Sequence, residues 1–102
     1  MNLFHTVRRR FTFSGGLEEY RETPNAVLLD VRSPGEYAQG HIPGSINIPA
    51  PEINRIKIDK GQPLFVYCLS GARSDGAVSW LRSAGYNAKN IGGIGGYQGE
   101  IE

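Results

Sequence analysis

The sequence predicts a single α/β domain with a central parallel β-sheet, and three observations support this prediction. Two short runs, residues 26–30 and 63–67, are continuously apolar, as in strands buried on both faces. Segments with helical spacing of apolar residues follow these runs, and alternating strands and helices produce right-handed crossovers and a parallel sheet. The 102 residues suit one hydrophobic core, and no internal repeat or linker divides them. We expect four to five strands with helices on both faces.

The N-terminal elements are expected in the following order. Residues 11–13 alternate briefly and predict a short strand. Ser14 is then a candidate cap for a helix through residues 17–20. The segment Thr23-Pro24-Asn25 breaks that helix, and the apolar run 26–30 is the first buried strand.

A short helix is expected after the first buried strand. Ser33 has the character of a helix cap, Pro34 suits the first helical position, and Glu36 favours the first turn. The turn-rich segment 40–44 leads to a strand candidate at 45–48, which the prolines of segment 49–51 end. Residues 52–60 are compatible with either a short helix or a loop.

The C-terminal part begins with the second buried strand, which ends at Cys68. A helix is expected from Arg73 or Ser74 to Ala84, ended by Gly85. Its apolar positions are Ala77, Val78, Trp80 and Leu81. A final short strand at 87–91 precedes a glycine-rich turn at 92–96.

Composition narrows the class of protein. The formal net charge is +1 and the apolar share is 39%, which indicates an ordinary globular chain without a strongly charged partner. No stretch approaches the roughly 18 apolar residues of a membrane span, and the N-terminus has no signal-peptide core. A single cysteine cannot form an internal disulfide and fits a reducing compartment. We therefore expect a cytoplasmic protein with no membrane partner.

Basic residues are concentrated near the N-terminus. Arg8, Arg9 and Arg10 are three of the eleven lysines and arginines. Such a group binds nucleic acid or anionic lipid in some proteins, but without interleaved aromatic residues it is more typical of a solvated segment or a guarded strand edge. We expect no nucleic-acid partner, and His5 has no assigned role.

The only cysteine, Cys68, lies where a strand should end and a helix begin. Backbone N–H groups and the positive end of a helix both favour the thiolate, which is the reactive form of cysteine. The alternative is an idle, buried thiol, which is what most free cysteines are. The neighbourhood favours chemistry at sulfur.

The segment after the cysteine has the composition of an anion-binding loop. Its N–H groups can curl around the sulfur; Gly71 permits the tight curl, Ser70 can donate a hydroxyl hydrogen bond, and Arg73 can supply a charge at the rim. This loop would stabilise a thiolate, a persulfide or an oxyanion. Its members are Leu69, Ser70, Gly71, Ala72, Arg73 and Ser74.

Three motifs together resemble one known family. The loop Cys68–Ser74 after an apolar strand is similar to the active-site loop of rhodanese-type sulfurtransferases. Residues 28–37 with 40–49 resemble the second signature of that family, and residues 90–97 resemble its closing glycine-rich turn. The resemblance covers about residues 11–97 of a domain expected to span 1–102.

The resemblance implies a sulfurtransferase that uses Cys68 as its nucleophile. Cys68 would take a sulfane sulfur from a small anionic donor such as thiosulfate and hold it as a persulfide. A thiol or cyanide, or a sulfur-carrier protein, would then accept that sulfur. No cofactor is implied, and the two histidines and one cysteine lie too far apart in sequence for a good metal ligand set.

Four further residues are assigned a supporting role. Asp30 ends the first buried strand, so it should lie at the same sheet edge as Cys68. Arg32 is positioned to pair with either Asp30 or Glu36, and the resemblance implies scaffolding for this signature. His41 is a conceivable base for Cys68, but a turn residue that bonds backbone is the preferred interpretation.

Two other functions remain as alternatives. Phosphatases and arsenate reductases of similar architecture have five residues between cysteine and arginine, whereas four separate Cys68 from Arg73, and Tyr67 stands where phosphatases usually have histidine. A non-catalytic partner-binding module is the second alternative, although such modules typically lack the cysteine. A sulfur relay without significant thiosulfate turnover is a variant of the main hypothesis.

Overall fold

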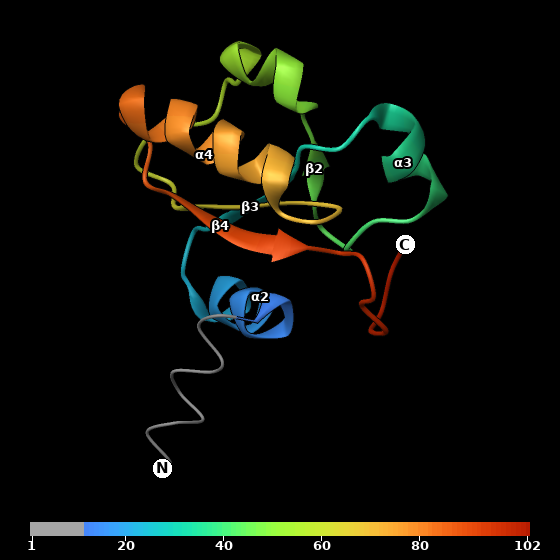
Figure 1. The fold of residues 1–102 in the computed structure, drawn as a ribbon. Helices are drawn as coiled ribbons and strands as arrows, with labels where there is room; N and C mark the ends of the chain where they lie inside the picture. Colours follow the sequence, from blue (N-terminus) through green and yellow to red (C-terminus); the bar gives the residue numbers. More distant parts are fainter. Residues whose placement is uncertain (1–11) are drawn as a thin grey trace.

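A computed structural model of the chain describes residues 12–102. Within this range the fold is a central sheet with helices on its two faces (Figure 1). The predicted roles of Arg8–Arg10 and His5, and Phe11 of the predicted first strand, lie outside the described residues. No helix among residues 12–102 has the length and apolar character needed to cross a membrane.

The sheet is parallel and contains four strands in the order β2-β1-β3-β4. The two central strands are the two apolar runs of the sequence, because a central strand buries both of its faces. The predicted parallel sheet is therefore confirmed. The strands are β1 (Val27–Asp30), β2 (Ile46–Asn47), β3 (Leu64–Cys68) and β4 (Ala88–Gly93).

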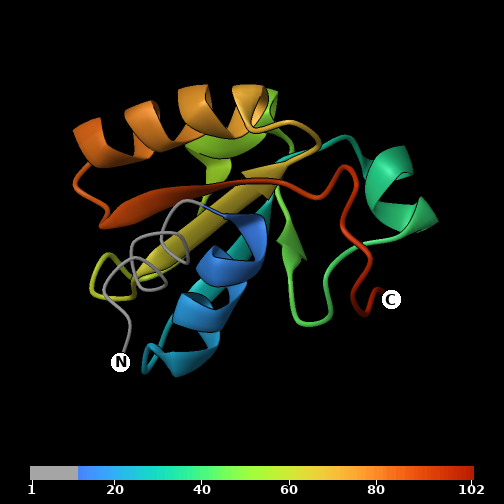
Figure 2. The same ribbon diagram turned by 60° about the horizontal axis from the view of Figure 1, so that its bottom comes forward.

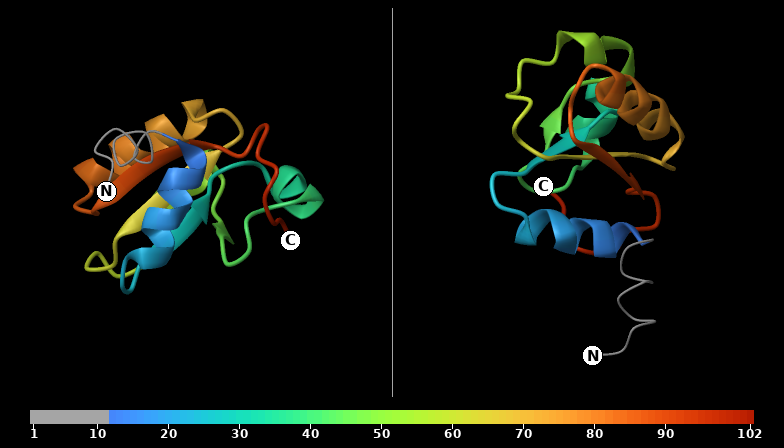
Figure 3. Two further views of the ribbon diagram at one scale, coloured as in Figure 1. Left: turned by 90° about the horizontal axis from the view of Figure 1, so that it is seen from below. Right: turned by 90° about the vertical axis from the view of Figure 1, so that its left-hand side faces the viewer.

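Helices cover both faces of the sheet, as predicted. Helix α4 (Ala72–Ser83) and the 3₁₀ helix η1 (Ala50–Arg55) lie on one face, and α2 (Phe13–Glu22) lies on the other (Figures 1 and 3). The short helix α3 (Pro34–Gln39) lies beyond the carboxyl ends of the strands (Figure 1). Figure 2 shows α2, in blue, crossing the sheet on the side opposite to α4.

The alternation of side chains along β1 and β3 creates two separate core layers. Leu29 and Val66 pack toward α4 and η1, with Val31 and Cys68 on the same side. Phe65 and Tyr67 belong to the other layer, together with Leu28 of β1 and Leu17 of α2. Because successive strand residues point to opposite faces, the sulfur of Cys68 belongs to the layer under α4.

The beginning of α2 differs from the prediction. Phe13 is the first helical residue rather than part of a strand, and the cap is Thr12 rather than Ser14. The Thr12 hydroxyl accepts a hydrogen bond from the Gly15 N–H at 2.9 Å, which satisfies one free donor of the first turn. The Phe13 ring packs edge-on against Tyr67, so tertiary contact decides where the helix begins.

Helix α3 begins as predicted. Ser33 is its cap, Pro34 its first residue, and Glu36 lies in its first turn. The Ser33 hydroxyl accepts from the Glu36 N–H, while the Glu36 carboxylate accepts from the Ser33 N–H at 3.0 Å. This reciprocal capping box fixes the Glu36 side chain at the carboxyl edge of the sheet.

The two remaining helical segments refine the prediction. The undecided region 52–60 contains the end of η1 followed by a loop, and η1 begins two residues earlier, after Pro49. Helix α4 begins at Ala72, one residue before the predicted start. Trp80 was predicted at an apolar position of α4, but its side chain is 39% exposed. It lies beside the helix stripe that faces the sheet, which Ser74, Ala77, Val78 and Leu81 form.

Candidate active site

The candidate site is built around Cys68 at the carboxyl end of β3. Cys68 is the last residue of the strand and is fully buried. The chain turns at Gly71, whose φ of +101° lies in the left-handed region, and α4 begins at the next residue. The turn therefore brings the sulfur to the N-terminal end of α4.

The loop surrounds the sulfur with hydrogen-bond donors. The N–H of Gly71 donates to Cys68 Sγ at 3.0 Å, and the N–H of Ser74 donates at 3.4 Å. The Ser74 hydroxyl lies 3.3 Å from the same sulfur. These donors form the curled loop that the sequence predicts.

These contacts change the acidity of the thiol. Burial raises the pKa of Cys68, but the hydrogen bonds from the Ser74 hydroxyl and from the N–H groups of Ser74 and Gly71 lower it by more. The net pKa lies below the ordinary value of a cysteine. The thiolate is therefore favoured by donors rather than by a neighbouring base.

Ser70 does not have its predicted contact. Its hydroxyl accepts a hydrogen bond from the Ala72 N–H at 3.4 Å, whereas Ser74 supplies the hydroxyl that reaches the sulfur. Ser70 and Ala72 are exposed, and Leu69 exposes 48% of its surface at the outer side of the loop. The Ser74 hydroxyl, rather than that of Ser70, reaches the sulfur, while the Ser70 N–H contributes to lowering the pKa of Cys68.

The glycine-rich turn after β4 supports the loop from behind. The Ile94 N–H donates to the Cys68 carbonyl at 2.9 Å, and the Gly95 N–H donates to the Leu69 carbonyl at 3.0 Å. A Cβ atom at Gly93 would overlap that Leu69 carbonyl, so only glycine permits this approach. The glycine count of the sequence signals such a contact, although it does not identify the partner.

Arg73 is paired rather than free at the rim. Its guanidinium donates to both Glu36 carboxylate oxygens, at 2.6 and 3.0 Å. These bonds and the Ser33 N–H lower the pKa of Glu36 to about 2. The pair joins α3 to the Cys68 loop, and it means that Glu36 does not pair with Arg32.

Asp30 and Arg32 form a buried ion pair. The Arg32 guanidinium donates to Asp30 at 2.6 and 3.0 Å, and also to the Gly40 carbonyl at 2.7 Å. The Asn47 side-chain amide donates to the carbonyls of both Asp30 and Arg32. These hydrogen bonds connect the end of β1 with β2 and with the turn after α3. The pair therefore has a position suited to scaffolding.

His41 lies in that turn and bonds backbone, as preferred from the sequence. Its Nδ1 lies 2.8 Å from the Tyr37 carbonyl, and its ring stacks on the Tyr37 ring with centroids 3.6 Å apart. Its backbone N–H donates to the Glu102 carbonyl. Within residues 12–102, His41 makes no hydrogen bond to Cys68.

Tyr67, the residue before the cysteine, faces the opposite layer. Its hydroxyl accepts from the Ile42 N–H at 3.1 Å and lies 3.1 Å from the Ser45 hydroxyl. Burial raises the pKa of Tyr67 to about 12, so it stays neutral at physiological pH. Neither Tyr67 nor His41 is placed to remove a proton from Cys68.

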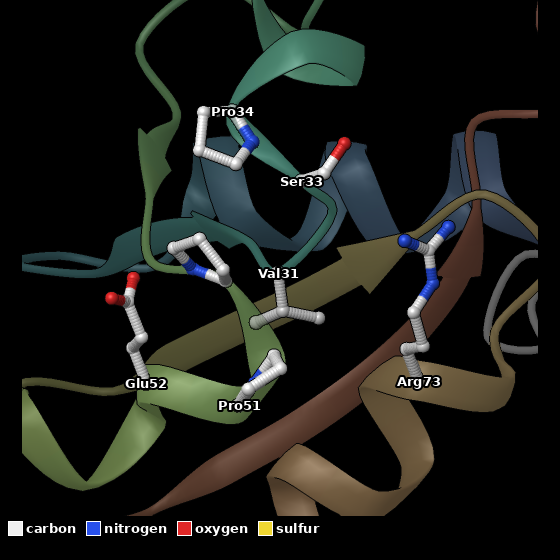
Figure 4. Close-up of a pocket in the computed structure, with 7 residues that line it drawn as sticks. Val31, Ser33, Pro34, Pro51, Glu52 and Arg73 are labelled. Atoms are coloured by element: carbon white, nitrogen blue, oxygen red, sulfur yellow. The ribbon is translucent and has the colours of Figure 1, made fainter.

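A cleft of about 480 Å³ opens at the carboxyl edge of the sheet (Figure 4). Arg73 lies at one end and Glu52 at the other, with the Val31 side chain between them (Figure 4). Because Asp30 pairs with Tyr67 in the parallel register, Val31 is the neighbour of Cys68 on the same face. The lining residues are Val31, Ser33, Pro34, Pro49, Pro51, Glu52 and Arg73.

The cleft and loop offer hydrogen-bond donors and apolar walls rather than metal ligands. Among residues 12–102, no group of three or more His, Cys, Asp and Glu side chains could hold a metal ion. A nucleophilic sulfur within a ring of amides can hold a small anion or a second sulfur atom.

Comparison with known proteins gives consistent matches. A sulfurtransferase of Allochromatium vinosum is 39% identical over 67 residues, covering 64% of this chain and 63% of the relative. A thiosulfate:glutathione sulfurtransferase of Saccharomyces cerevisiae is 37% identical over 86 residues, covering 70% and 62%. The chain thus spans slightly less than two thirds of the length of these two curated relatives.

The fold and the sequence profile agree with those matches. A rhodanese-like domain protein from Staphylococcus aureus superposes with a TM-score of 0.79 at 28% identity, covering 90% of this chain and 94% of that structure. The profile described as Rhodanese-like domain matches residues 15–100. The chain belongs to the family of rhodanese-like domains.

Proposed function

We propose that the protein is a sulfurtransferase that carries sulfane sulfur on Cys68. The observation that carries this proposal is the set of donors on Cys68 Sγ, with the N–H of Gly71 at 3.0 Å and the Ser74 N–H and hydroxyl at 3.4 and 3.3 Å. These donors favour a charged sulfur without any base or metal. They would stabilise the negative charge of a thiolate on Sγ, and the amides of the same loop would hold the charge of a terminal persulfide.

The reaction consists of two displacements at sulfur. The Cys68 thiolate attacks the outer sulfur of thiosulfate, the sulfur–sulfur bond of the donor breaks, and sulfite leaves with the electron pair. The thiolate of an acceptor then attacks the outer sulfur of the Cys68 persulfide, which returns Cys68 to the thiolate and yields an acceptor persulfide. Electrons balance within each step, so no cofactor is required.

Thiosulfate as donor and a low-molecular-weight thiol as acceptor are supported by the yeast relative, whose name states both. The cleft supports the acceptor assignment, because about 480 Å³ is enough for a small molecule. Cys68 does not line the cleft itself, but Val31, which does, belongs to the same core cluster as Cys68. We propose that the acceptor thiol occupies this cleft while the sulfane sulfur stays inside the loop.

A relay to a carrier protein is a second candidate, favoured by Leu69. This apolar residue exposes 48% of its surface on the loop that holds the reactive sulfur, where a partner would contact it. In a relay the persulfide would pass to a cysteine of the partner by the same displacement. Slow turnover with small thiols, together with stable sulfur loading of Cys68, would favour the relay.

Phosphatase chemistry has less support. A phosphatase of this architecture would use its loop arginine to bind phosphate oxygens. Here both terminal nitrogens of the Arg73 guanidinium donate to Glu36, and the loop is one residue shorter between cysteine and arginine. Turnover of p-nitrophenyl phosphate without thiocyanate formation from thiosulfate and cyanide would contradict the proposal.

Mass spectrometry of the intact protein tests the covalent intermediate. Incubation with thiosulfate should add one sulfur atom, about 32 Da, and a reductant should remove it. Cys68→Ser should show neither the added mass nor thiocyanate production, while its circular dichroism and melting temperature stay close to those of the parent. Thiocyanate production by the folded Cys68→Ser protein would contradict a Cys68 persulfide.

A further inference from the structure

Asn90 is a polar side chain of β4 that contacts the Cys68 loop from the neighbouring strand. Its Oδ1 lies 2.8 Å from the Ser74 hydroxyl, and its Nδ2 donates to the Gly71 carbonyl at 3.1 Å. Ser74 and Gly71 are the same two residues that donate to Cys68 Sγ. Asn90 therefore contacts both residues that surround the sulfur, without contacting the sulfur itself.

A bulge in β4 aims Asn90 at the loop. Val66 pairs with Asn90, whereas Tyr67 pairs with Gly92, so Ile91 is an extra residue on β4. The Gly92 N–H folds back to donate to Asn90 Oδ1 at 2.9 Å. This bond also fixes the amide orientation, because the opposite orientation would set the Asn90 NH₂ against an N–H donor.

The Ser74 hydroxyl has more acceptors than hydrogens. It lies 2.8 Å from Asn90 Oδ1, 3.1 Å from the Gly71 carbonyl and 3.3 Å from Cys68 Sγ. A hydroxyl carries a single hydrogen, so it can donate fully to only one of the three at a time. The shortest contact is the one to Asn90, and a charged sulfur is the acceptor that would gain most from the hydrogen.

Two ion pairs lie near the loop. Arg73 is held by Glu36, and Asp30 is held by Arg32. The hydrogen bonds to the sulfur come from neutral donors, while the Arg73 charge acts on Cys68 without a hydrogen bond.

We propose that Asn90 is a positioning residue that holds Ser74 and Gly71 against Cys68. Asn90 fixes the Ser74 side chain through Oδ1 and the Gly71 carbonyl through Nδ2, which keeps the donors of these two residues within reach of the sulfur. The role of Asn90 in turnover rests on the sulfur transfer proposed above; its role toward the thiolate does not.

Alkylation of Cys68 by iodoacetamide, followed by mass spectrometry across a range of pH, tests this directly. In Asn90→Ala the midpoint of the rate profile should move to higher pH. The rate near neutral pH should fall about three- to tenfold, the equivalent of one weakened hydrogen bond. Asn90→Asp should lower the alkylation rate near neutral pH further, because a carboxylate holds the Ser74 hydrogen more strongly and repels the thiolate. Asn87→Ala, which alters an exposed asparagine just before β4, is the matched control and should keep the parent profile.

A double-mutant cycle separates positioning from a general structural effect. If Asn90 acts through Ser74, the rate losses of Asn90→Ala and Ser74→Ala should combine to less than their product. Independent losses, or a parent-like profile in folded Asn90→Ala, would overturn the proposal. Each variant is measured only where circular dichroism shows it folded, and Asn90→Asp covers the case in which Asn90→Ala does not fold.

The alkylation assay tests the positioning role of Asn90 independently of the proposed sulfur transfer, because alkylation needs no sulfur donor. A shifted profile in Asn90→Ala, together with an unmodified parent mass after thiosulfate, would support the positioning role and contradict thiosulfate as donor. An unshifted profile with normal sulfur loading would do the reverse.

Discussion

Among individual residues, Glu36 affects the site in a way that the sequence did not predict. Its carboxylate accepts a hydrogen bond from the Ser33 N–H in the α3 capping box. The same carboxylate accepts from both terminal nitrogens of Arg73. Its pKa of about 2 keeps it ionised at all physiological pH values. The Glu36 carboxylate offsets the positive charge of Arg73 and occupies its donors, so Glu36 restrains the anion affinity of the loop.

We expect Glu36→Gln to lower the KM for thiosulfate about two- to fivefold, because the Arg73 charge is no longer offset by a carboxylate at the rim, where exposed ionic contacts contribute modestly. Initial rates of thiocyanate formation at several thiosulfate concentrations give this KM. Glu52→Gln removes a different cleft carboxylate, one that pairs with Arg55 at 3.5 Å, and should change KM less. A higher KM in Glu36→Gln would mean that the pair mainly holds the loop in shape.

Among the elements, α2 shows how a glycine fixes the distance between a helix and the sheet. A Cβ atom at Gly16 would lie 2.5 Å from the Ile91 Cβ, closer than side-chain atoms pack. Ile91 is the bulge residue of β4, next to Asn90. The position of α2 is therefore coupled to the strand that supports the candidate site.

Gly16→Ala should lower the free energy of unfolding by about 1–3 kcal/mol, the usual cost of overpacking a core. Gly76→Ala is the matched control, since it also replaces a helical glycine but its Cβ would meet no atom within 4 Å. There alanine should stabilise by about 0.5–1 kcal/mol, because it restricts the unfolded chain. Urea denaturation of the three proteins measures both effects. Equal stability of Gly16→Ala and the parent would contradict the close packing of α2 on β4.

The same elements show which features a sequence reveals. The runs that became β1 and β3 were predictable because burial on both faces leaves an unbroken apolar pattern. The α3 cap was predictable because Ser33, Pro34 and Glu36 act locally. The start of α2 was not, since the Phe13 contact with Tyr67 joins residues 54 positions apart. The prediction that Trp80 packs in the core was wrong. Its large apolar side chain suits a core, but its position around the α4 axis lies outside the stripe that faces the sheet.

In the candidate site, too, local features could be predicted from the sequence, whereas contacts between distant segments could not. The Cys68 loop is contiguous, so its residues and its curl follow from the motif. The pairing of Arg73 with Glu36 and the contact of Asn90 with Ser74 join distant segments, and the sequence pattern predicted neither contact. The sequence assigned the hydroxyl donor to Ser70, whereas the first turn of α4 places the Ser74 hydroxyl over the sulfur.

At the scale of the whole molecule, the buried pair of Asp30 and Arg32 holds the carboxyl edge together. Asp30 is fully buried and Arg32 is 5% exposed. Through Gly40 and Asn47 the pair connects β1 with β2 and with the turn after α3. The residues that follow β1 and β2, Val31 and Pro49, line the cleft, so the pair stabilises the frame of the site rather than its chemistry.

Arg32→Ala should therefore destabilise the protein by about 3–5 kcal/mol, because it leaves the Asp30 carboxylate buried without its partner. Arg55→Ala is the control: its pair with Glu52 is exposed, at 78% and 49% of the two side chains, and its loss should cost less than about 1 kcal/mol. Urea denaturation followed by circular dichroism measures both. The double variant Asp30→Asn with Arg32→Ala should recover part of the loss, since no uncompensated charge remains. Equal costs for Arg32→Ala and Arg55→Ala would show that the buried pair does not hold the edge.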